Sequence, residues 1–100
     1  MVRHIVIWNH ADGLSETERG ENAKKLKAEL ENLKNLIGGI VDIKVYSDAL
    51  PSSNRAILLD VLFENPEALA AYTIHPEHVR AGQFVRAVTK DRACMDFVVE

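Results

Sequence analysis

Cysteine, proline and aromatic residues are all scarce in this sequence, whose 100 residues include one cysteine, three prolines, three Phe, two Tyr and one Trp. A single cysteine cannot form an intrachain disulfide. Cys94 also lies in the apolar run 93–99 (ACMDFVV), where a thiol behaves as a packing residue. We therefore assign no chemistry to this cysteine.

An excess of positive charge and long apolar runs are also missing. The twelve Lys and Arg are scattered along the chain and the formal net charge is -3, which does not suit a phosphate backbone. Apolar runs such as 5–8 fall far short of the roughly 20 residues that span a bilayer, and a strand pattern begins at the N-terminus, where a signal peptide would lie. We expect a cytoplasmic protein that binds neither nucleic acid nor a membrane.

The composition is that of a small globular domain, with 47% hydrophobic and 27% charged residues. The sequence contains no internal repeat, linker or low-complexity segment. Residues 1–100 are therefore expected to form a single domain.

The first half of the sequence predicts a strand, a long helix and a second strand. Residues 2–8 (VRHIVIW) are rich in β-branched and aromatic side chains, and their alternation places His4 and Trp8 on one face. Ser15 and Glu18 match the capping-box pattern, and apolar residues spaced by three and four predict one helix that continues to the glycines at 38 and 39. Residues 40–46 alternate as a second strand.

The second half predicts a strand at 56–64, two helices and a last strand at 93–99. Asn65 and Pro66 are typical of a helix start, and this helix is expected to end near Tyr72. Pro76 begins the next helix. The order of these elements predicts an α+β fold of the ferredoxin-like kind, with helices on one face of an antiparallel sheet.

The opposite face of this sheet would carry many apolar side chains, namely Ile5, Ile7, Leu58, Leu62, Met95, Phe97 and Val99. An apolar face of this size needs a cover in water. We expect a homodimer in which two copies pack sheet to sheet.

The segment YTIHPEHV at 72–79 contains the most informative candidate residues. If Pro76 occupies the first helical position, His78 lies in the first turn, where the helix dipole disfavours a positive charge. A neutral imidazole can act as a general base near neutral pH. Asp96, in an apolar strand, needs a hydrogen-bond donor, and we expect it to be buried and bonded to His78 at under about 3.2 Å.

Three blocks of the sequence together resemble the stress-responsive A/B barrel (Dabb) family, namely VRHIVIW at 2–8, EALAAYTIHPEHV at 67–79 and DRACMDFVVE at 91–100. The resemblance covers essentially the whole chain and implies a single Dabb domain that forms a dimeric α/β barrel. The family includes plant stress proteins and a plant polyketide cyclase that closes an aromatic ring by aldol chemistry.

By this resemblance, Tyr72 and His78 match the catalytic tyrosine and histidine of the cyclase, and His4 matches its histidine on the first strand. Ile57 stands where the cyclase has a further histidine, and Trp8 is bulkier than the cyclase residue at its position. The resemblance therefore implies acid–base chemistry on a carbonyl compound, with a different substrate and a smaller cleft.

The candidate catalytic residues are Tyr72, His78, Asp96 and His4. The candidate substrate-binding residues are Trp8, Ile57, Leu59, Val61, Phe63 and His75. We expect a small apolar carbonyl ligand and no cofactor. No metal site is expected, because the two histidines of H-P-E-H are three residues apart with a proline between them, unlike the spacing of four on a zinc helix.

Structural interpretations of the same residues remain open. His4 also fits a hydrogen-bonded interior histidine, His75 a helix cap and Tyr72 a helix packing residue, while an Asp96–His78 bond would also lock the last helix to the last strand. If these structural interpretations hold, the chain is a non-catalytic dimer that acts in the stress response or binds a ligand. A cofactorless monooxygenase is a third alternative, by analogy of fold alone. An open cleft where Tyr72, His78 and His4 converge would favour the enzyme.

Overall fold

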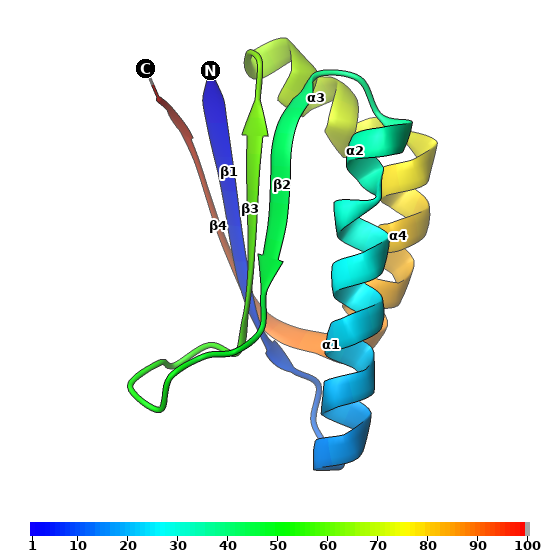
Figure 1. Cartoon of the computed structure of the whole chain (residues 1–100), viewed down its shortest axis with the longest axis vertical. Coiled ribbons are helices and arrows are strands. Elements are labelled where there is room, and N and C mark those ends of the chain that lie inside the picture. Colours follow the sequence, from blue (N-terminus) through cyan, green and yellow to red (C-terminus); the bar gives the residue numbers. More distant parts are fainter. Residues whose placement is uncertain (100) are drawn as a thin grey trace.

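The computed structural model describes residues 1–99 and contains one four-stranded antiparallel sheet with all its helices on one side (Figure 1). The strands are β1 (Val2–His10), β2 (Ile40–Tyr46), β3 (Ile57–Phe63) and β4 (Thr89–Val98). The helices are α1 (Glu16–Glu31), α2 (Leu33–Leu36), α3 (Pro66–Ile74) and α4 (Pro76–Val88). The strand order is β2-β3-β1-β4, which confirms the predicted ferredoxin-like α+β fold.

Three predicted helix starts have the expected side-chain caps. Ser15 Oγ accepts from the backbone N–H of Glu18 at 3.1 Å, and the Glu18 carboxylate accepts in return from the backbone N–H of Ser15 at 2.9 Å. Asn65 caps α3, because its Oδ1 accepts from the backbone N–H of Ala68 at 2.8 Å. His75 caps α4, because its Nδ1 accepts from the backbone N–H of Glu77 at 3.1 Å. Each cap satisfies a backbone donor that the helix itself leaves unpaired.

Two element boundaries differ from the sequence prediction. The long helix is interrupted at Asn32, which ends α1 and precedes α2, and its side-chain oxygen accepts from Asn35 Nδ2 at 3.0 Å. The last strand begins at Thr89 and not at residue 93, because α4 passes directly into extended backbone.

The hydrophobic core lies between the helices and one face of the sheet. On β1 and β3 every second residue is buried on this face, as the alternation predicted. The turn before β2 approaches α3 so closely that a Cβ at Gly39 would lie 2.6 Å from the Cβ of Ala68. Gly39 also has φ of 87°, a conformation that glycine adopts without strain.

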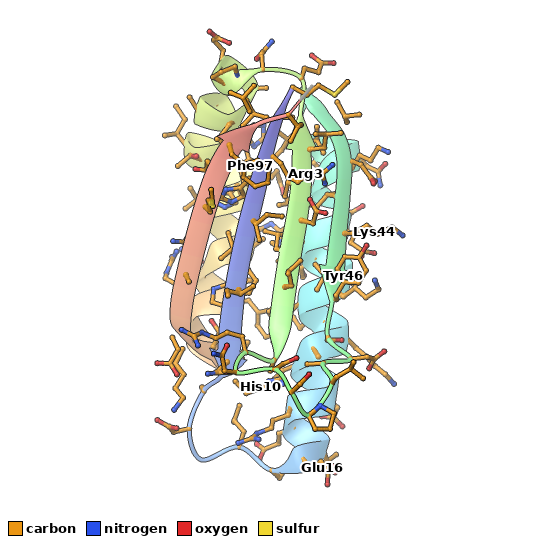
Figure 2. The ribbon with its side chains drawn as sticks, turned by 90° about the vertical axis from the view of Figure 1, so that its left-hand side faces the viewer. Arg3, His10, Glu16, Lys44, Tyr46 and Phe97 are labelled. Atoms are coloured by element: carbon orange, nitrogen blue, oxygen red, sulfur yellow. The ribbon has the colours of Figure 1, made fainter. Side chains whose placement is uncertain are left out.

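The other face of the sheet has no helix over it. Figure 2 looks onto this open face, where Arg3, Lys44, Tyr46 and Phe97 project from β1, β2 and β4. Arg3 is bonded to Asp60 there, with 2.6 Å between Nη1 and Oδ1. Apolar side chains surround this ion pair, namely Ile5, Ile7, Leu58, Leu62, Met95 and Phe97.

β4 forms one edge of the sheet and is mostly exposed on both faces. Asp96, which we expected to be buried, has 43% of its side chain exposed. That prediction is wrong because the helices cover the inner strands and leave the edge strand open. Cys94, expected to be a packing residue, is exposed for the same reason. In residues 1–99 no helix is long and apolar enough to cross a membrane.

Candidate active site

A cavity of about 210 Å³ lies between the sheet and the helices. Its apolar walls come mainly from β1, α1, β3 and α4, and include Trp8, Leu30, Leu59 and Val85. Its polar groups come from four elements and are His4, Tyr72, His78, Arg86 and Arg92. The bulky Trp8 lines the cavity without filling it, so open space remains where Tyr72, His78 and His4 converge.

Tyr72 brings a hydrogen-bond donor to this cavity from the last turn of α3. Its side chain is 1% exposed, and its hydroxyl has no hydrogen-bond partner within residues 1–99. Burial raises the pKa of Tyr72 far above the usual tyrosine value. The phenol therefore keeps its proton, and a ligand oxygen in the cavity could accept a hydrogen bond from it.

His78 lies beside Tyr72, with 4.2 Å between the two ring centroids. Its Nδ1 is 3.1 Å from the carbonyl oxygen of Thr73, and that oxygen can only accept, so we assign the proton to Nδ1. Nε2 is then the unprotonated nitrogen. Burial lowers the pKa of His78, the hydrogen bond to Thr73 opposes this, and the positive charges of Arg86 and Arg92 lower it further.

The two rings converge because His75 joins the helices that carry them. Its backbone N–H donates to the Tyr72 carbonyl at 3.1 Å and ends α3, while its side chain caps α4. The Thr73 carbonyl in the last turn of α3 then holds the His78 ring in the first turn of α4. Pro76 at the first helical position suits this tight junction.

Asp96 is bonded to His4 and not to His78, so the predicted Asp96–His78 hydrogen bond is wrong. His4 and Asp96 are directly opposite on β1 and β4, and His4 Nδ1 hydrogen-bonds with Asp96 Oδ1. Side chains of opposed residues on one face of a sheet lie close together. His78 Nδ1 is meanwhile taken by Thr73. His4 in turn lies near Tyr72, with 6.0 Å between their ring centroids.

Several of the predicted substrate-binding residues do not line the cavity. Trp8 and Leu59 do so. Ile57, Val61 and Phe63 share their face of β3 but belong to the closed core, where Phe63 packs against the Tyr72 ring at 5.0 Å. His75 serves as the helix cap described above. Period-two alternation identified the face correctly but not the position along the strand at which the helices leave space.

Sequence reasoning missed Arg86, Arg92 and Gly82, which all line the cavity. Gly82 and Arg86 follow His78 by four and eight residues, which places all three on one side of α4. Arg92 shares the alternation of Asp96 on β4. These spacings could have identified both arginines, although the positive residues are scattered along the chain.

His4, Cys94 and Asp96 form the one group in residues 1–99 whose side-chain atoms lie close enough to share a metal ion, within 4.8 Å of one another. Nitrogen, sulfur and oxygen donors of this kind suit Zn²⁺. Burial, followed by the charge of Asp96, raises the pKa of the partly exposed Cys94 thiol, so without a metal the sulfur is protonated. A metal would also have to break the His4–Asp96 hydrogen bond. The absence of a metal stays a prediction.

A larger groove of about 420 Å³ lies elsewhere, between the open face of the sheet and the loop that joins β2 and β3. Ile7, Tyr46 and Leu58 line it. It contains none of the four histidines and neither of the candidate acid–base groups. The smaller cavity is therefore the better candidate active site.

Comparison with known proteins agrees with this fold. The chain is 25% identical over 99 residues to olivetolic acid cyclase from Cannabis sativa, covering 96% of this chain and 94% of the cyclase. A dimeric protein with a ferredoxin-like fold from Bacteroides fragilis superposes with a TM-score of 0.88 at 31% identity, covering 96% of this chain and 93% of that one. Hydroxynitrile lyase from Passiflora edulis shares the fold at 15% identity, with a TM-score of 0.82 and coverage of 99% and 93%.

The decisive match is to a family model, because it spans nearly the whole sequence. The model of the stress responsive A/B barrel domain matches residues 2–99. These residues include every element of the sheet and all the polar groups of the cavity. The chain belongs to the stress-responsive A/B barrel (Dabb) family.

Proposed function

We propose that this protein is a small-molecule enzyme that performs acid–base chemistry on a carbonyl compound in the cavity. One observation carries the proposal: the unpartnered, buried hydroxyl of Tyr72 lies beside the neutral ring of His78. An unpaired buried hydroxyl costs free energy, and a site that binds a ligand oxygen recovers it.

In the proposed reaction, Tyr72 donates its O–H to the carbonyl oxygen of the substrate while Nε2 of His78 removes a proton from the adjacent carbon. The electron pair of the C–H bond forms the enolate double bond, and the carbonyl π pair moves to the oxygen bonded to Tyr72. The protonated His78 then returns the proton at a different position, which gives an isomer.

Ring closure follows the same first step. The enolate carbon attacks a second carbonyl of the same molecule, a C–C bond forms, and His78 gives its proton to the new alkoxide. Asp96 assists by fixing the ring of His4 at the edge of the cavity, which replaces the role that we first assigned to it beside His78. The similarity to a cyclase and to a lyase supports chemistry of this class.

We further propose that two copies pack sheet to sheet through their open faces. The apolar side chains around the Arg3–Asp60 ion pair would then leave water. The loop before β3 extends beyond the sheet on this side (Figure 1), and its Leu50 is 72% exposed. The similar structure from Bacteroides fragilis is described as dimeric, which supports the same assembly here.

A ligand-binding protein without catalysis is the second candidate. The cavity volume of about 210 Å³ favours it to some extent, because drug-sized ligand sites usually measure roughly 300 to 1,000 Å³. A cavity this small would hold a compact molecule without room for a large rearrangement. A measurement of catalytic turnover distinguishes the proposed enzyme from a ligand-binding protein.

The test is hydrogen–deuterium exchange at the carbon between the carbonyls of short diketones and diketide analogues, followed by NMR. Tyr72→Phe and His78→Ala should each slow the exchange by roughly 10²- to 10⁴-fold. The matched control is His10→Asn, which removes a histidine that does not line the cavity. Exchange that is unaffected by both active-site substitutions would remove Tyr72 and His78 from the mechanism.

A further inference from the structure

Two arginines of the cavity have no part in the chemistry described above. We propose that the cavity takes a small oxo-carboxylate whose carboxylate is bound by Arg86 and Arg92. This inference rests on the proposed function and names the class of substrate for the same site.

Arg86 is placed over the cavity by the geometry of α4. His78, Gly82 and Arg86 are spaced by four residues and lie along one side of the helix. Helical side chains point back toward the N-terminus, and the Arg86 side chain lies over Gly82, with Nη1 3.2 Å from where a Cβ of that glycine would be. The guanidinium thus lies level with Gly82, about one helical turn along α4 from the backbone of His78.

Arg92 reaches the same cavity from the opposite wall, on β4. The residue before it, Asp91, has φ of 56°, and the pairing of β4 with β1 shifts register here, as at a bulge. Two contacts hold this bulge: Asn9 Nδ2 donates to the Asp91 carboxylate at 3.1 Å, and Arg55 Nε donates to the Asp91 carbonyl at 2.9 Å. The backbone that carries Arg92 is therefore fixed at the cavity rim.

Neither guanidinium has a carboxylate partner within residues 1–99. Arg3 is paired with Asp60, and Arg80 with two glutamates, but no ion pair includes Arg86 or Arg92. No acidic side chain lines the cavity. Both arginines are exposed at the rim of the cavity, so an anion that enters the cavity could meet two guanidinium groups that no carboxylate of the described residues occupies.

A carboxylate fits this site for two reasons. The planar guanidinium group binds two carboxylate oxygens at once. Tyr72 and His78 need a carbonyl with an acidic neighbouring carbon, and a 3-oxo carboxylate supplies both features in a molecule of few atoms. Such a molecule suits a cavity of about 210 Å³.

The experiment compares acetoacetate with its neutral methyl ester, using calorimetry and the ¹⁵N–¹H signal of Gly82 to measure binding. The wild-type protein should bind acetoacetate more tightly than the ester. Arg86→Gln and Arg92→Gln should each weaken acetoacetate binding roughly 10- to 100-fold, the effect of one charge-assisted contact, and leave ester binding unchanged. Arg80→Gln is the matched control, because it removes one charge from α4 outside the cavity and should change neither affinity.

Equal affinity of the wild type for acid and ester, or equal loss of both in the two arginine variants, would overturn the proposal. Inorganic phosphate is the third probe: if it binds more tightly than acetoacetate and loses affinity in the same variants, the ligand carries a phosphate group and the carboxylate assignment is wrong.

If the proposed acid–base function is wrong, the result differs from the results that would overturn the anion site. Acetoacetate would then bind with the expected dependence on Arg86 and Arg92 but show no deuterium exchange at its methylene carbon, which leaves the anion site in place. Exchange of the methyl ester that depends on Tyr72, without any preference for the acid, would instead leave the function in place and overturn the anion site.

Discussion

Tyr72 O–H and His78 Nε2 are complementary groups, a donor that keeps its proton and an acceptor that lacks one. Burial is the main cause of both states, because it raises the pKa of Tyr72 and lowers the pKa of His78. The same desolvation therefore keeps a hydrogen-bond donor protonated and a proton acceptor unprotonated side by side. Neither group needs a charged partner for this.

The pH dependence of turnover should reflect the lowered pKa of His78. Protonation removes the base, so the rate should fall only as the pH falls through a value below the ordinary 6.5 of histidine. The alkaline side should show no loss from Tyr72, whose pKa is raised. In Arg86→Gln, loss of a nearby positive charge should raise the pKa of His78 and move the acid limb to higher pH. Profiles of kcat/KM against pH measure this, and a wild-type limb centred at or above 6.5 would contradict it.

At the scale of secondary-structure elements, the two glycines Gly39 and Gly20 should respond to alanine in opposite ways. Gly39→Ala should lower the free energy of unfolding by about 1 to 3 kcal/mol, because φ is 87° and the new Cβ would meet Ala68. Gly20 lies within α1 with open space around it, so alanine there should raise the free energy by about 0.5 to 1 kcal/mol. Urea unfolding of both variants measures the difference, and equal effects would contradict this account of Gly39.

Local sequence patterns were sufficient to predict the helices and strands. They were not sufficient to predict which residues lie next to each other in the folded chain. Ser15, Asn65 and Pro66 marked helix starts that the structure has, and alternation gave the faces of β1 and β3. The partner of Asp96 could not be predicted in this way, because it depends on strand order and register, which bring His4 opposite Asp96.

The same limit applies to the cavity. The position of the cavity along a strand depends on where the helices that cover the strand end. Tertiary packing therefore decides which residues of the strand line the cavity. Leu59 and Ile57 share one face of β3, yet only Leu59 reaches the cavity.

At the scale of the whole molecule, we expect Phe97→Asp to separate the proposed dimer. Phe97 lies on the open face opposite Arg3, so an aspartate there stays close to a positive charge in the free monomer but would bury a carboxylate in a sheet-to-sheet interface. Analytical ultracentrifugation at micromolar concentration should find a dimeric wild type and a monomeric variant. Ile74→Asp is the control, because Ile74 is 79% exposed at the end of α3. A monomeric wild type would contradict the assembly.

The junction at His75 has a consequence for how the proposed activity is distributed along the chain. Tyr72 and His78 are six residues apart, and the bonds that orient them all lie within 72–78. His4 and Arg92 reach the cavity only through long-range strand pairing. The local geometry of the proposed reactive pair is thus encoded in one short contiguous peptide, whereas its burial and the other groups of the cavity depend on the completed fold. Exchange of residues outside this segment could therefore alter the choice of substrate without changing the local bonds that orient Tyr72 and His78.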